Sequence, residues 1–122
     1  MIFIDTNYLI RFFTNDIKDQ AKLAKEVIEK QKVYITGIVL AESVYILESH
    51  YKASKFDLTT KLISLLRQEN VAGASYLILS LEIYQKESIS YYDCLLASEV
   101  LKGKGELMTF DKKLQKVIKK YS

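Results

Sequence analysis

The sequence predicts one α/β domain spanning residues 1–122, a three-layer sandwich in which helices flank a short, mostly parallel central sheet. Short apolar runs alternate along the chain with longer segments of helical periodicity. This alternation is typical of a parallel sheet that helices cover on both faces. The length fits one domain that buries a core without disulfides. A composition of 49% hydrophobic and 27% charged residues is ordinary for a soluble globular protein.

The first half of the chain is predicted to hold two short strands and three helices. A buried strand at 2–5 precedes a helix that ends near Asn15–Asp16. The apolar residues between 21 and 28 repeat with a period of about 3.6, which predicts a second helix to about Lys30. These elements are followed by a strand at 33–36 and a largely buried helix at 37–51.

The second half is predicted to hold four helices and two further strands. The segment 71–88 is ambiguous, and we interpret it as a strand fragment near Tyr76 followed by a helix. A helix from about Tyr91 to Leu101 is expected to stop at the glycines that follow it. The remaining elements are a helix at 56–68, a strand at 106–109, and a final basic helix whose apolar stripe is Leu114, Val117, Ile118 and Tyr121.

Cys94 and His50 are the only cysteine and the only histidine, which excludes an intrachain disulfide and a histidine-rich zinc site. We interpret Cys94 as a small buried apolar residue and His50 as a structural residue at a helix end. The opening residues lack the pattern of a secretion signal. No apolar run approaches the roughly 18 residues that span a membrane. We therefore expect a soluble, cytoplasmic protein.

The net charge of +3 does not by itself indicate a nucleic-acid partner, but lysines concentrate near the C-terminus. They are Lys102, Lys104, Lys112, Lys113, Lys116, Lys119 and Lys120. This cluster is either a solvated helix face or a surface that contacts an anionic partner.

Four acidic residues from distant segments are predicted to meet at one edge of the sheet. Asp5 ends the first strand, and Asp111 follows the predicted strand at 106–109. Both carboxylates should emerge at the carboxyl edge, where parallel sheets bind ligands. Glu42 and Asp93 lie in the first turns of helices that are expected to begin at the same edge.

Each acid also has a structural explanation. Asp5 and Asp111 suit the N-caps of the helices that follow them. Ser90 and Asp93 fit a capping box, and Glu42 can be an ordinary solvated residue. Together, however, the acids favour a shared site. Apolar neighbours make Glu42 difficult to place on a solvated face, and Asp93 precedes the apolar run CLLA.

A cation is the simplest way to keep such a cluster, because neighbouring carboxylates repel one another. Oxygen ligands without histidine or thiolate suit Mg²⁺ or Mn²⁺ rather than zinc. A metal-bound water is a nucleophile near neutral pH, and the metal offsets the charge that builds on a phosphate. The cluster therefore predicts phosphodiester hydrolysis without a serine, cysteine or histidine nucleophile.

Several stretches of the chain match a known family: IFIDTNYLIRFF (2–13), ITGIVLAESVYILESHY (35–51), LEIYQKE (81–87) and SISYYDCLLASEVLKGKGELMTFDKKL (88–114). Through them the chain resembles, over almost its whole length, the PIN-domain ribonucleases, and most closely the VapC-type toxins of prokaryotic toxin–antitoxin pairs. DTN alone is a weak signal. DTN-x-L-x-R, a glutamate before VYIL, and Asp93 eighteen residues before the aspartate of TFDKKL form a specific combination.

The resemblance implies a PIN-like fold with an acidic Mg²⁺ or Mn²⁺ pocket. The implied direct ligands are Asp5 and Asp93, while Glu42 and Asp111 help to place the metal and its water. The implied polar supports are Thr6, Asn7 and Thr109. The resemblance also implies an endoribonuclease, a homodimer, and a cognate antitoxin whose tail covers or enters the acidic site.

RNA that reaches an acidic pocket needs positive charge at the rim. Arg11, Lys112 and Lys113 are the candidates for positioning its phosphates. Aromatic side chains can stack on unpaired bases, but the sequence does not indicate which of its nine tyrosines are exposed.

Other functions agree less well with the sequence. A haloacid-dehalogenase phosphatase needs a second aspartate as general acid at the position of Asn7, whose amide cannot take that role. A response-regulator receiver needs an aspartate at the end of a mid-chain strand, and the sequence shows none there. Two alternatives stay open: a PIN nuclease of RNA processing without an antitoxin, and a non-catalytic RNA- or protein-binding module that retains the fold. The chain departs from the family pattern in Cys94, where alanine is common, and in ending where many relatives have another strand.

Overall fold

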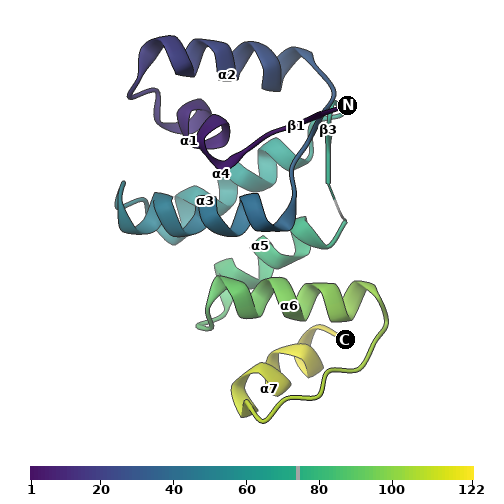
Figure 1. The fold of residues 1–122 in the computed structure, drawn as a ribbon. Coiled ribbons are helices and arrows are strands. Elements are labelled where there is room, and N and C mark those ends of the chain that lie inside the picture. The colour runs from purple at the N-terminus through teal and green to yellow at the C-terminus, as the bar shows by residue number, and fades with distance from the viewer. Residues whose placement is uncertain (74) are drawn as a thin grey trace.

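The computed structural model describes residues 1–73 and 75–122, and the elements of these residues are arranged around one short sheet (Figure 1). In chain order they are β1 (Ile2–Phe3), α1 (Thr6–Thr14), α2 (Lys18–Lys30), β2 (Val33–Tyr34), α3 (Gly37–Ser49), α4 (Lys55–Leu66), β3 (Val71–Ala72), α5 (Tyr76–Lys86), α6 (Tyr91–Lys102) and α7 (Lys112–Tyr121).

The sheet is parallel, with the strand order β1-β2-β3. Ile2 lies opposite Val33, and Val33 lies opposite Val71. Helices connect each strand to the next, as parallel neighbours require. The predicted α/β class, in which helices flank a short parallel sheet, is confirmed.

Side-chain caps fix the starts of several helices. Thr36 caps α3 by accepting a hydrogen bond from the N–H of Val39 at 3.2 Å. Ser54 and Ser90 cap α4 and α6 in the same way. Each of these bonds satisfies a donor that has no partner within the helix. The starts of these three helices therefore follow from local sequence, whereas α2 and α5 begin without a side-chain cap.

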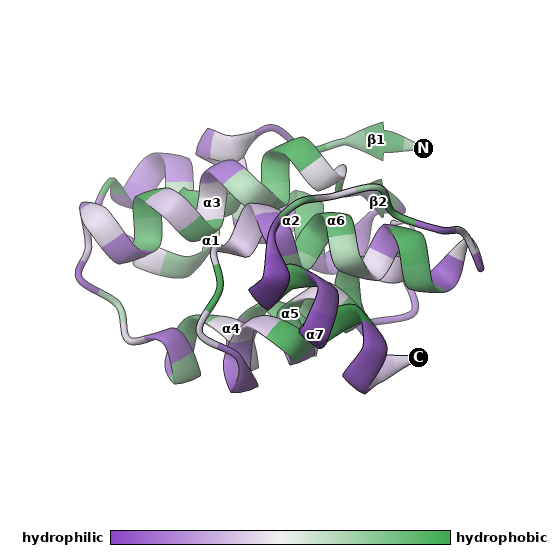
Figure 2. Cartoon of the chain, turned by 90° about the horizontal axis from the view of Figure 1, so that it is seen from below, coloured by the Kyte–Doolittle hydropathy of each residue, from purple (hydrophilic) through white to green (hydrophobic). Residues whose placement is uncertain are grey.

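The core lies between the helices and the sheet. Its largest fully buried side chains include Leu9, Leu40, Leu62 and Leu81. Cys94 is 0% exposed, and burial raises the pKa of its thiol to about 12, so its interpretation as a buried apolar residue is confirmed. In α7 the apolar residues pack inward, while lysines make much of its outer surface hydrophilic (Figure 2).

Two strand predictions are wrong. Tyr76 is the first residue of α5, and the strand in that region is Val71–Ala72, which pairs with β2. Ala74, inside the ambiguous segment 71–88, lies outside the described residues. Residues 106–109 form no strand. In Figure 1 they follow α6 toward α7, away from β1. A strand needs a partner for its backbone groups, and apolar character alone does not supply one.

The end of α6 is predicted correctly, but the residue that reverses the chain is not a glycine. Gly103 has a right-handed φ of −79°, whereas Lys104 has φ 52°. The last helix residue is Lys102. None of the described helices has both the length and the apolarity needed to cross a membrane.

Candidate active site

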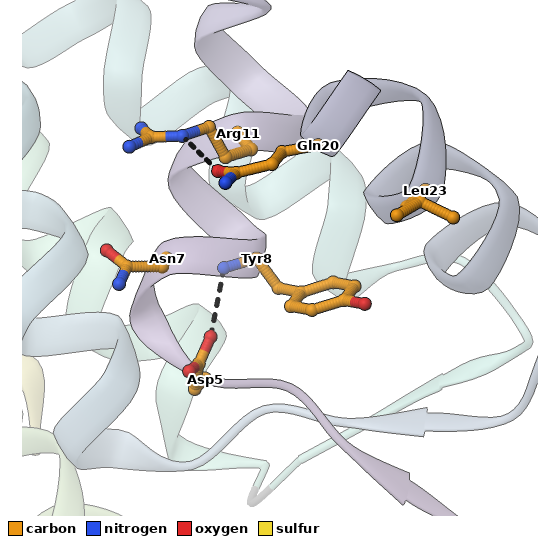
Figure 3. A pocket seen from close by; sticks show the side chains of 6 residues that line it. All are labelled: Asp5, Asn7, Tyr8, Arg11, Gln20 and Leu23. Carbon is orange, nitrogen blue, oxygen red and sulfur yellow. Dashed lines mark hydrogen bonds between the residues drawn. The ribbon is translucent and has the colours of Figure 1, made fainter. Parts of the chain in front are cut away.

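Asp5 lies two residues beyond β1 and is the N-cap of α1. Its Oδ1 accepts a hydrogen bond from the N–H of Tyr8 at 3.0 Å (Figure 3). The predicted capping role of Asp5 is therefore confirmed. The side chain is exposed, so the cap does not remove the carboxylate from solvent or from a ligand.

A hollow of about 260 Å³ opens beside Asp5, between α1 and α2. It is lined by Asp5, Asn7, Tyr8 and Arg11 from the first helix region and by Gln20 and Leu23 from α2 (Figure 3). The structure thus brings together three of the predicted site residues: Asp5, Asn7 and Arg11. Thr6, beside them in sequence, is half-buried.

Arg11 is held in place by neighbours from three segments. Its Nε donates to Oε1 of Gln20 at 3.0 Å, and its Nη1 donates to the hydroxyl of Tyr51 at 3.4 Å. Nη1 also lies 3.5 Å from Oδ1 of Asp16. Hydrogen bonds from Tyr51 and Thr14, and the charge of Arg11, hold the pKa of Asp16 below its usual value. Arg11 is therefore an oriented cation with part of its charge balanced by Asp16.

Glu42 lies in the second turn of α3 and is exposed. The expectation that its apolar neighbours keep it from a solvated face is wrong. A helix turns about 100° per residue, so Ala41 and Ser43 on either side are buried while Glu42 points outward. α3 packs against both α1 and α6, which places Glu42 on the helix between those that carry Asp5 and Asp93.

Asp93 lies in the first turn of α6 and is half-buried. Its N–H donates to Oγ of Ser90 at 3.1 Å. Asp57 occupies the corresponding place in α4, where its N–H donates to Oγ of Ser54 at 3.2 Å. These two aspartates share one local geometry, and only Asp93 is a candidate metal ligand.

Asp111 caps α7, because its Oδ1 accepts hydrogen bonds from the N–H groups of Lys113 and Leu114 at 3.0 and 3.1 Å. Oγ1 of Thr109 in turn accepts from the N–H of Asp111 at 3.1 Å. Lys113 reaches the turn before α6, where its Nζ donates to the backbone oxygen of Ser88 at 3.1 Å. Lys112 is exposed at the start of α7.

The acids lie on successive helices that pack against one another, α1 on α3, α3 on α6, and α6 on α7. Within residues 1–73 and 75–122, no three His, Cys, Asp or Glu side chains are close enough to hold a metal ion together. The convergence of all four acids therefore stays a prediction. Mg²⁺ commonly binds through one or two carboxylates and keeps several waters, so these oxygen donors fit a hydrated ion better than an enclosed one.

The hollow is also lined by Tyr8, Gln20 and Leu23, which the sequence motifs do not predict as site residues. A signal for Leu23 exists, because it is an apolar residue outside the buried face of α2, which consists of Ala21, Ala24 and Ile28. Leu23 is 54% exposed. For Gln20, only the packing of α2 on α1 reveals its proximity to Arg11.

Comparison with known proteins now identifies the family. The family model of the PIN domain matches residues 2–120. The chain belongs to the PIN-domain family. Its PIN domain is also 25% identical, over 124 aligned residues, to the VapC ribonuclease of Aquifex aeolicus (strain VF5), and the alignment covers 96% of this chain and 92% of that protein. No solved structure matches significantly. The resemblance drawn from the sequence motifs is confirmed.

Proposed function

We propose that this PIN domain is an endoribonuclease that hydrolyses RNA phosphodiester bonds with Mg²⁺ or Mn²⁺. The observation that carries the proposal is the near end-to-end family match, together with the presence of Asp5, Glu42, Asp93 and Asp111 within it. Similarity to a protein named as a VapC ribonuclease supports the choice of RNA as substrate. A binding module without catalytic activity would have no need for all four acids.

In the proposed reaction, Asp5 and Asp93 would hold the divalent ion, and Glu42 and Asp111 would help to place the ion and its water. When bound, the ion supplies a water of lowered pKa and offsets negative charge on the phosphate. Asp5 is suited to this role because its cap engages only Oδ1. The hollow beside Asp5 also holds Arg11, whose fixed guanidinium can position a phosphate.

Lys112 and Lys113 have a corresponding role at the other end of the site. They begin α7 directly after Asp111. An RNA backbone that passes Asp111 would meet these two ammonium groups, which attract its phosphates regardless of base sequence. Lys113 is already fixed to the carbonyl of Ser88, so Lys112 is the freer of the two.

The biological role that we propose is the toxin of a type II toxin–antitoxin pair, working as a homodimer in the cytoplasm. Its similarity to a VapC ribonuclease supports this role. Induced expression should then arrest growth, and co-expression of a small protein encoded beside it should restore growth. Cleavage of RNA in vitro without growth arrest would favour the alternative, a PIN nuclease of RNA processing that has no antitoxin.

The test of the activity is cleavage of mixed cellular RNA by the purified chain with Mg²⁺, Mn²⁺ or chelator. Asp5→Asn and Asp93→Asn should each lower cleavage by about 100-fold or more, since loss of even an outer-shell partner of a metal ligand costs roughly 10- to 100-fold. Asp57→Asn is the matched control for Asp93→Asn, because both aspartates follow a capping serine in the same geometry. Equal cleavage by the parent and both site variants, or undiminished cleavage in chelator, contradicts the proposal.

A further inference from the structure

The hollow between α1 and α2 has an apolar side that solvent reaches. Tyr8 is 39% exposed and Leu23 is 54% exposed, and both line the hollow. In Figure 3 the ring of Tyr8 projects from α1 toward the part of α2 that carries Leu23. An exposed aromatic ring beside an exposed leucine is a surface on which a flat ligand can lie.

The other side of the hollow is polar and oriented. Oε1 of Gln20 accepts a hydrogen bond from Nε of Arg11 at 3.0 Å, so the amide of Gln20 is held in one orientation. Its nitrogen offers N–H donors to the hollow that Gln20 lines together with Tyr8. A ligand on Tyr8 therefore meets an aromatic face and hydrogen-bond donors at the same time.

This surface is directly next to Asp5. The N–H of Tyr8 donates to Oδ1 of Asp5 at 3.0 Å, so the ring and the carboxylate arise from the same turn of α1. Arg11, one turn further along, adds a positive charge at the rim. An aromatic platform, amide donors and a cation around one hollow match a nucleotide, whose base stacks and accepts hydrogen bonds while its phosphate is anionic.

We propose that Tyr8, Gln20 and Leu23 bind an unpaired base of the RNA substrate, adjacent to the phosphate at Asp5. This inference rests on the proposed function and specifies its substrate as single-stranded RNA. Bases in a duplex are stacked on one another and do not offer their faces to a side chain. Tyr8 supplies the stacking surface, Leu23 covers the base from α2, and Gln20 donates to its edge.

The experiment measures binding of a fluorescein-labelled, mixed-sequence single-stranded RNA by fluorescence anisotropy in chelator, where no cleavage is expected. Tyr8→Ala should weaken binding about 5- to 150-fold, the range that one lost base stack produces. Tyr8→Phe keeps the ring and should bind like the parent. Phe56→Ala removes another aromatic ring that is 66% exposed, on α4, and should also bind like the parent.

A second arm uses a blunt duplex of the same RNA, to which Tyr8→Ala should bind as the parent does. In a cleavage assay Tyr8→Ala should raise KM for the single strand by more than it lowers kcat. Melting temperatures of all variants are compared first. If Tyr8→Ala does not fold, Gln20→Ala takes its place and should also weaken binding of the single strand.

The outcomes separate this inference from the proposed function. If the parent cleaves RNA and Tyr8→Ala binds the single strand as tightly as the parent, the base site is wrong and the nuclease stands. If the parent binds single strands through Tyr8 but never cleaves, the base site stands and the nuclease fails. If Tyr8→Ala binds RNA normally and loses only a co-expressed partner protein, the hollow is a protein-binding site and the inference is overturned.

Discussion

Asp5 is expected to have two roles that different substitutions can separate. Its Oδ1 caps α1 by accepting the N–H of Tyr8 at 3.0 Å, and its exposed carboxylate is a proposed metal ligand. Asn caps helices about as well as Asp, whereas Ala provides no cap. Asp5→Asn should therefore remove only the metal ligand, while Asp5→Ala should remove both functions.

The expected loss of stability follows from this one hydrogen bond. Replacing a good N-cap with Ala costs about 1 kcal/mol. For 122 residues the entropy of unfolding is about 0.26 kcal/mol per kelvin, so Asp5→Ala should lower the melting temperature by about 4 °C. Leu9 and Ile10 remain buried in the core and keep α1 in place. Asp5→Asn should melt within about 1 °C of the parent.

The assay pairs thermal unfolding in chelator with RNA cleavage in Mn²⁺. We expect Asp5→Asn to melt like the parent and to lose cleavage, and Asp5→Ala to lose both stability and cleavage. Full cleavage by Asp5→Asn would show that capping is the whole role of this residue. Equal destabilisation of both variants would refute the reasoning from the cap.

Three further predictions concern other parts of the chain. In chelator, Asp93→Asn should melt higher than the parent, because Asp93 is half-buried and its repulsion from the other acids is screened less than that of the exposed Asp5. Its counterpart Asp57→Asn should melt slightly lower, because it loses a favourable charge at a helix start. A lower melting temperature for both variants would assign Asp93 a capping role only. Hydrogen bonds from Lys120 and then Tyr121 lower the pKa of Glu87 in the folded protein. The ionised carboxylate therefore stabilises the fold at pH values above its unfolded pKa, and this contribution disappears as the pH falls through its lowered folded pKa. Glu87→Gln should reduce the fall in melting temperature as the pH is lowered. Parallel curves of melting temperature against pH for parent and variant would exclude this contribution of Glu87. Burial raises the pKa of Cys94 to about 12, so iodoacetamide at pH 8 should label the native thiol far more slowly than the denatured thiol, and equal rates would contradict the buried position.

Much of the fold follows from local sequence. Helix α2 has strong periodicity and α6 has the capping residue Ser90, and both are predicted to within a few residues of their ends. The strand around Val33 is predicted because an apolar, β-branched run lies between two helical patterns. In these cases propensity, pattern and tertiary packing favour the same structure.

The misplaced elements are those that long-range packing determines. Tyr76 follows a small-residue segment, and its aromatic ring favours a strand by propensity, but the pairing with β2 uses Val71 and Ala72. The segment 106–109 has strand-like composition without a neighbouring strand to pair with. A two-residue strand carries too little periodicity for its register to be predicted from the sequence.

The candidate site divides in the same way. Asp5, Asn7 and Arg11 are close in sequence, and the geometry of one helix is enough to place them on one hollow. Gln20 joins them only because α2 folds back on α1. Whether Asp5 and Asp93 share an ion depends on the packing of α1, α3 and α6, which no local pattern specifies.

The most direct test of the central claim is the binding of Mn²⁺ measured by isothermal titration calorimetry. Carboxylates from four separate segments should contribute to one ion, so each of Asp5→Asn, Glu42→Gln, Asp93→Asn and Asp111→Asn should weaken binding by about 10-fold or more, and Asp57→Asn should bind like the parent. Unchanged affinity in all four variants, or an equal loss in Asp57→Asn, would contradict a shared metal site.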